Sequence, residues 1–253
     1  RGQPEWGGHL AAELEVLIAP QDENSIAAVI VEPVAGATGI LPPPLGYLER
    51  LREICTKHGI LLIFDEVITG FGRVGASFAA ERFDVIPDII TCAKGLTNGV
   101  IPMGAVLIKD EIYSTFMTGP EQMPELFHGY TYSGHPVAAA AGIAALEVYE
   151  EEGSFQQARE LEEMFADEAH QFDDHPRVID VRNFGLMAAV ELEPRDNAPG
   201  TRGLEVHKRL FWDENLVIRN TMDILQFCPF LNAKPEDIRS MFGAVKRVLD
   251  TLE

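Results

Sequence analysis

Four short apolar runs, separated by stretches long enough for helices or loops, constrain the fold of this chain more than any other feature. None of the runs contains a charged residue, and they cover residues 26–31, 60–64, 89–92 and 105–108. Such runs are typical of strands that are buried on both faces of a parallel sheet. A helix is expected over residues 45–58, where Gly59 would end it. Strands and helices in this alternation predict an α/β fold.

The second half of the chain has a different pattern. A long loop rich in Gly, Pro and aromatic residues occupies residues 118–136, and loops of this kind often carry function. After it, helices are expected at 137–152, 154–172, 203–214 and 235–252, and short strands at 178–181, 188–191, 216–218 and 224–227. This order of elements predicts a smaller α+β domain.

Charged residues follow three of the apolar runs. Glu32 follows the first run, Asp65 and Glu66 follow the second, and Lys94 lies just beyond the third. Because α/β proteins bind ligands at the carboxyl ends of parallel strands, we expect these side chains to lie close together. One such residue could simply begin a solvated loop, but three together favour a binding site.

Asp65 and Lys94 suggest a specific chemistry. Asp65 is expected to be partly buried, so it needs a cationic partner such as a Lys, an Arg, a metal or a protonated ligand nitrogen. A desolvated Lys94 would lose its proton more easily and could form a Schiff base. An Asp that keeps a ring nitrogen protonated and a Lys that forms a Schiff base are what pyridoxal phosphate requires. A buried Asp65–Lys94 ion pair without a cofactor fits the spacing equally well.

Composition excludes several classes of protein. The chain has 40 Asp and Glu residues against 20 Lys and Arg, a net charge of −20, whereas nucleic-acid binding needs clustered basic residues. No apolar run is long enough to span a bilayer, so no membrane partner is expected. Three widely spaced cysteines, Cys55, Cys92 and Cys228, form no CxxC pair and indicate a reduced compartment, which predicts a cytoplasmic protein.

Two other motifs have ordinary explanations. Gly70, Gly72 and Gly75 match the GxGxxG pattern of dinucleotide-binding proteins. Five residues separate the second run from Gly70, and no strong helix follows Gly75, so a flexible loop beside a site fits better than NAD binding. A nicotinamide dehydrogenase remains an alternative. His170 and His175 lack the spacing of a metal pair, and no metal site is expected.

Several segments resemble the class III aminotransferases of the fold-type I pyridoxal-phosphate enzymes. They are FDEVITGFGRVG (64–75), PDIITCAKGLTNGVIPMGAV (87–106), HGYTYSGHPVAAAAG (128–142) and the stretch 27–67. HGYTYSGHP and LVIRNTMD (216–223) resemble the ω-amino acid:pyruvate branch most, which includes β-alanine:pyruvate aminotransferases.

The resemblance implies a fold and a domain division. The fold would be the mostly parallel sheet of the large domain of these transferases, incomplete here, with a smaller C-terminal α+β domain. Residues 1–134 would belong to the large domain, and residues 135–253 would form a linking helix and the small domain. Family members supply a further phosphate-binding loop and a ring-stacking aromatic residue from a part that would precede Arg1, so the chain resembles the C-terminal portion of a longer enzyme.

The resemblance also implies which residues bind pyridoxal 5′-phosphate. Lys94 would hold the cofactor covalently and then carry the proton between Cα and C4′ during the reaction. Asp65 would pair with the pyridine nitrogen, and Val67 would pack against the ring. Thr131 would bind the cofactor phosphate of the neighbouring subunit, which implies a homodimer or tetramer.

Two residues would serve the substrate. Glu32 would lie on the substrate side of the cofactor, and Arg219 would bind the substrate carboxylate through its guanidinium. Met222 stands where relatives usually carry Gly. The implied activity is transfer of an amino group from an ω-amino acid or amine to a keto acid such as pyruvate. The alternatives are another class III pyridoxal-phosphate enzyme, such as an aminomutase or a keto-acid-dependent or decarboxylating relative, and an inactive fragment.

Overall fold

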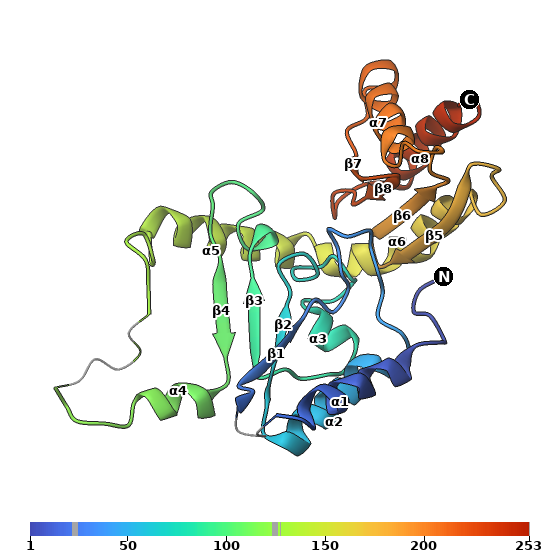
Figure 1. The fold of residues 1–253 in the computed structure, drawn as a ribbon. Helices are drawn as coiled ribbons and strands as arrows, with labels where there is room; N and C mark the ends of the chain where they lie inside the picture. The colour runs from blue at the N-terminus through green and yellow to red at the C-terminus, as the bar shows by residue number, and fades with distance from the viewer. Residues whose placement is uncertain (22–24, 123–125, 127, 253) are drawn as a thin grey trace.

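Two four-stranded sheets organise the chain (Figure 1). The computed structural model describes residues 1–21, 25–122, 126 and 128–252. The first sheet has the strand order β1-β2-β3-β4 and the second has the order β5-β6-β8-β7. Among the described residues, no helix is both long and apolar enough to cross a membrane.

The first sheet is mostly parallel, as predicted. Its strands are β1 (Ala28–Val31), β2 (Leu61–Asp65), β3 (Ile89–Cys92) and β4 (Ala105–Ile108). The first three run parallel, whereas β4 runs antiparallel to β3. The reason is the connection between β3 and β4, which contains only the 3₁₀ turn η3 (Lys94–Leu96) instead of the crossover helix that a parallel pair needs.

Helices cover one face of this sheet. They are η1 (Gly8–Ala12), α1 (Glu13–Ile18), α2 (Tyr47–His58) and the short α3 (Ala79–Arg82). Helix α2 ends at Gly59, which has a left-handed φ of 65°, as expected of a helix C-cap. Leu51 and Ile54 of α2 share a buried cluster with Leu62 and Phe64 of β2, so this face holds the core.

The opposite face of β1 corrects one expectation. Ile30 points away from the α2 core and is 61% exposed, so β1 is not buried on both faces. Ile30 pairs with Ile63, which in turn pairs with Ile89. Ile30, Ile63 and Ile89 thus form one row across the sheet, on the face away from α2.

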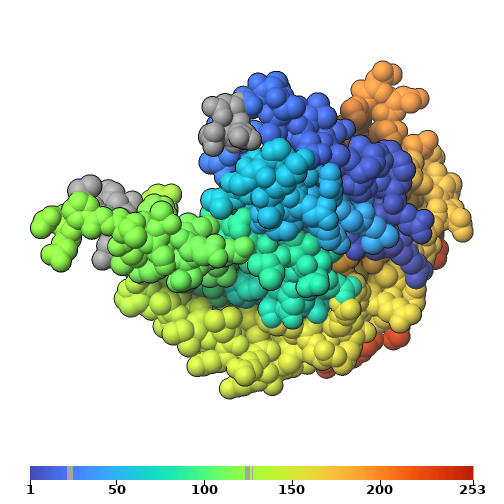
Figure 2. All heavy atoms as spheres, turned by 90° about the horizontal axis from the view of Figure 1, so that it is seen from below, coloured from blue at the N-terminus to red at the C-terminus, as the bar shows by residue number. Residues whose placement is uncertain are grey.

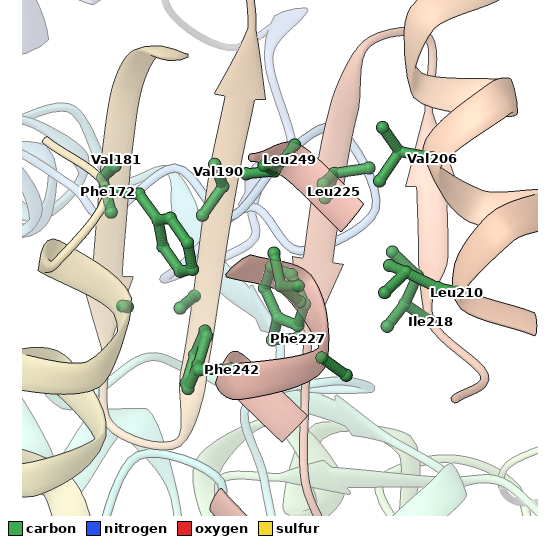
Figure 3. Packing of buried hydrophobic residues seen from close by; sticks show 14 of the residues in the cluster. Phe172, Val181, Val190, Val206, Leu210, Ile218, Leu225, Phe227, Phe242 and Leu249 are labelled. Atoms are coloured by element: carbon green, nitrogen blue, oxygen red, sulfur yellow. The ribbon is translucent and has the colours of Figure 1, made fainter. Parts of the chain in front are cut away.

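The second sheet is antiparallel and has its own core. Its strands are β5 (Val178–Phe184), β6 (Met187–Leu192), β7 (Arg219–Thr221) and β8 (Ile224–Phe227), and its helices are α6 (Ser154–His170), α7 (Thr201–Glu214) and α8 (Pro235–Leu249). Phe172, Phe227 and Phe242 meet at its centre (Figure 3). The strand expected at 216–218 begins instead at Arg219, because Met222 (φ 54°) makes the tight turn into β8.

One segment projects from the rest of the molecule. It comprises α4 (Asp110–Phe116) and the described part of the loop before α5 (Pro136–Glu151), and it is the green arm in Figures 1 and 2. Tyr130 and Tyr132 on this loop are 82% and 79% exposed. Met123, Pro124, Glu125 and Phe127 of the predicted functional loop lie outside the described residues. The domain boundary near residue 134 stays a prediction.

Candidate active site

A cavity of about 560 Å³ lies between the carboxyl ends of the first sheet and the second sheet. Lys94, Gly95 and Phe71 line it from the first half of the chain, and Arg219 and Cys228 line it from the second. Its volume suits a small ligand. Of the six residues predicted for the site, Lys94 and Arg219 line this cavity.

Lys94 lies directly after β3, as the strand-end argument predicted. It has a left-handed φ of 46°, a conformation that costs a non-glycine residue about 1–2 kcal/mol. Its side chain is exposed, so the expectation of a desolvated lysine is wrong for this structure, because the η3 turn carries Lys94 beyond the buried strand. In the part of the chain that the structure describes, no ion pair joins Lys94 to Asp65.

Asp65 and Glu66 end β2 in different environments. Asp65 is half-buried, as expected, and its Oδ1 accepts a hydrogen bond of 3.1 Å from the backbone N–H of Val67. Glu66 is fully buried and accepts hydrogen bonds from the N–H groups of Ala79 and Ala80 and from the Thr69 hydroxyl. Burial raises the pKa of the Glu66 carboxyl, and these hydrogen bonds oppose the rise. Glu66 therefore organises the chain between β2 and α3.

The other predicted residues lie farther from the cavity. The carboxylate of Glu32 accepts a hydrogen bond of 3.0 Å from the N–H of Gly36, which lines the cavity, so Glu32 shapes the wall. Asp65 and Val67 lie at the end of β2, beside the end of β3 that Lys94 follows, but they do not line the cavity. Thr131 is exposed on the projecting loop and is not brought to this cavity.

The GxGxxG segment has a packing role. A Cβ at Gly72 would clash with Phe155 of α6, and one at Gly75 would lie 3.2 Å from the Cα of Arg159. Between these glycines, the guanidinium of Arg73 donates hydrogen bonds to the carbonyl oxygens of Leu186 (3.3 Å) and Pro229 (2.6 Å). The glycines let this loop approach the second half of the chain closely, which accounts for the pattern without a dinucleotide.

Three cations act on one thiol of the cavity wall. Burial raises the pKa of the Cys228 thiol, and the positive charges of Arg73, Arg219 and Lys94 oppose that rise. Arg73 and Cys228 line the cavity beside Arg219 and Lys94. The lining holds these three cations against one carboxylate, Glu152, so it is net positive in a chain of net charge −20, which favours an anionic ligand such as a carboxylate.

Sequence reasoning did not identify three of the residues that line the cavity. Arg73 lies within the glycine pattern, and Cys228 entered the sequence analysis only as one of three widely spaced cysteines. Tyr149 lies in the apolar helix α5 and lines the cavity. The sequence around Tyr149 does not distinguish it from an ordinary core residue, because its role depends on the packing of α5 against the turn that contains Gly95.

The comparison with protein families settles which family the chain represents. The class III aminotransferase family matches residues 3–249. The chain belongs to this family. It is 56% identical over its whole length to an omega-aminotransferase of Caulobacter vibrioides, covering 57% of that protein. It is 49% identical to a beta-alanine–pyruvate aminotransferase of Pseudomonas aeruginosa, with 99% of this chain and 56% of that one covered.

Solved transaminase structures have the same fold. The omega transaminase from Pseudomonas jessenii in complex with PMP superposes with a TM-score of 0.92 at 35% identity, covering 98% of this chain and 56% of that one. The chain thus spans little more than half the length of the relatives it matches.

The residues present fit the cofactor of this family, pyridoxal phosphate. The donor set has the chemistry that this cofactor needs, since a lysine amine lies at the cavity wall and a carboxylate ends the neighbouring strand. In the described residues, neither group uses the other as an ion-pair partner. Both therefore remain able to meet a ligand.

Proposed function

We propose that the protein carrying this chain is a pyridoxal-phosphate-dependent transaminase. It moves an amino group from an ω-amino acid or amine, such as β-alanine, to a keto acid such as pyruvate. The observation that carries the proposal is that the amine of Lys94 and the guanidinium of Arg219 line one cavity whose charged lining residues are net positive. The names of the similar proteins from Caulobacter vibrioides and Pseudomonas aeruginosa support the choice of substrates.

Each residue then has a defined task. When bound, pyridoxal phosphate supplies an aldehyde that condenses with amino groups and a ring that withdraws electrons. Lys94 Nζ would hold the cofactor and would carry a proton from Cα of the amino donor to C4′ of the cofactor. Asp65 pairs with the ring nitrogen, and the Val67 N–H orients its carboxylate. The Val67 side chain packs on the ring.

The remaining residues bind substrate and complete the assembly. Arg219 binds the substrate carboxylate through charge-assisted hydrogen bonds, and Glu32 holds the wall on the substrate side. Thr131 lies on an exposed arm, which supports a role in the neighbouring subunit's site and hence a homodimer or tetramer. The free cysteines Cys55, Cys92 and Cys228 support a cytoplasmic location.

An assay of the intact protein tests the proposal. With pyridoxal phosphate, β-alanine and pyruvate, we expect the formation of alanine. Lys94→Ala should abolish it, whereas Lys208→Ala, which changes an exposed lysine on α7, should leave it unchanged. Alanine formation by Lys94→Ala at the normal rate would contradict the proposal. Isomerisation of the amino acid without consumption of pyruvate would show an aminomutase instead.

A further inference from the structure

The backbone at Lys94 needs support from outside its own segment. Its left-handed φ of 46° is one that residues with a side chain rarely adopt, and η3 is only three residues long. The next residue, Gly95, lies tightly against Phe71, since a Cβ at Gly95 would be 2.7 Å from the Cβ of Phe71. Phe71 itself has a φ of 60°. The turn that presents Lys94 is thus held by packing.

Tyr149 of α5 supplies a specific contact to this turn. Its hydroxyl donates a hydrogen bond of 2.8 Å to the carbonyl oxygen of Gly95. Its ring stacks on Phe71 at 6.4 Å between centroids and contacts Phe155 at 5.2 Å. The side chain is 8% exposed, so it has a fixed position. Burial raises the pKa of the Tyr149 hydroxyl, against the opposing charge of Arg73, and the phenol keeps the proton that it donates.

We propose that Tyr149 is a positioning residue for Lys94, because its hydroxyl fixes the Gly95 carbonyl and so holds the strained turn that aims the lysine amine into the cavity. This inference rests on the proposed function, since it assumes that Lys94 reacts with the cofactor. It adds a residue from the linking helix α5, which joins the two halves of the chain, to the machinery of the site. Misplacing a reacting group by about 1 Å can cost about a hundredfold in rate.

Covalent labelling of Lys94 tests this role without measuring activity. The intact apoprotein is mixed with pyridoxal phosphate, the attached cofactor is fixed by borohydride reduction, and the labelled Lys94 peptide is followed by mass spectrometry. Tyr149→Phe removes only the hydroxyl, and we expect it to slow labelling about tenfold. In steady state, kcat should fall about tenfold while KM for pyruvate stays within about twofold.

Tyr47→Phe is the matched control, because Tyr47 packs in the α2 core away from the cavity, and its labelling rate should equal that of the wild type. Wild-type labelling and kcat in Tyr149→Phe would overturn the inference. Circular dichroism shows whether Tyr149→Phe is folded at the assay temperature. If its labelling is slow only because the variant is unfolded, that result would also count against the inference. Absence of label on Lys94 in the wild type would instead overturn the proposed function.

Discussion

At the scale of single residues, two adjacent carboxylates at the end of β2 separate into different roles. Asp65 is half-buried and accepts one hydrogen bond from a backbone N–H, whereas Glu66 is fully buried and accepts three hydrogen bonds. The sequence predicts that Asp65 and Glu66 both lie at the edge of the sheet, but it does not show which of them is buried among backbone N–H groups. The division depends on the return of residues 79–80 to Glu66, which is a tertiary contact.

Glu66→Gln should destabilise the protein. The amide keeps the size of the side chain but replaces one acceptor oxygen with a donor, so at least one buried N–H loses its partner at a cost of about 1–3 kcal/mol. Urea unfolding measures the loss. Glu81→Gln changes an exposed carboxylate that accepts one N–H and should cost less than about 0.5 kcal/mol. Equal losses in the two variants would contradict this account of Glu66.

At the scale of elements, Asp88 ties helix α2 to strands of the first sheet. It lies just before β3, and its carboxylate accepts hydrogen bonds from Arg52 of α2, from the N–H of Leu62 in β2 and from Lys109 after β4. Burial alone would raise the pKa of Asp88, but the hydrogen bonds with Lys109 and Arg52 prevail and lower it from 3.8 to about 2.

The stability that Asp88 contributes should depend on pH. Because its pKa is lower in the folded state than in the unfolded state, its contribution of about 2 kcal/mol is present above pH 4. It is lost as the pH falls towards 2. We expect the difference in unfolding free energy between the wild type and Asp88→Asn to shrink between pH 6 and pH 3. A difference that stays constant over this range would refute the linkage.

A second feature at the scale of elements is the contact between residues 70–75, the loop that contains Arg73, and the turn that joins β5 to β6. Gly185 has a φ of 57°, and a Cβ there would lie 2.5 Å from the carbonyl oxygen of Arg73. Gly153 has a similar φ of 62° with nothing within 4 Å. Gly185→Ala should therefore destabilise the protein by about 2 kcal/mol more than Gly153→Ala in urea unfolding. Similar losses would mean that backbone strain alone matters at both glycines.

The elements show how far the sequence could predict the fold. Apolar runs located β1, β2, β3 and β4 to within two residues, because burial imposes that pattern on each strand separately. The antiparallel direction of β4 was not predictable in the same way, since it depends on a connection without a helix. Lys94 and Asp65 could be predicted as site residues because ligands bind at strand ends, whereas Tyr149 and Arg73 act through tertiary contacts that leave no local pattern.

At the scale of the whole molecule, the distribution of charge matters more than its sum. The chain carries a net charge of −20, yet Arg73, Arg219 and Lys94 gather around Cys228 in the cavity. Against the one carboxylate of the lining, Glu152, these cations leave the cavity net positive, which supports the proposed binding of a carboxylate.

Arg219→Met should weaken the binding of donors that carry a carboxylate. Loss of a charge-assisted pair is expected to raise the β-alanine concentration for half-maximal rate about tenfold or more in the donor half-reaction, followed by cofactor absorbance. An amine donor without a carboxylate should react as with the wild type. Arg239→Met changes an exposed arginine of α8 and serves as the control. Equal effects on both donors would exclude Arg219 as the carboxylate-binding group.

The visible spectrum of the intact protein tests the central claim most directly, namely that Lys94 binds pyridoxal phosphate covalently. Addition of the cofactor to the apoprotein should produce the visible absorbance of a lysine-bound pyridoxal phosphate. Lys94→Ala should remove that band and leave the spectrum of the free cofactor, while Lys208→Ala should retain it. An unchanged band in Lys94→Ala would contradict the assignment of Lys94 and, with it, the proposed function.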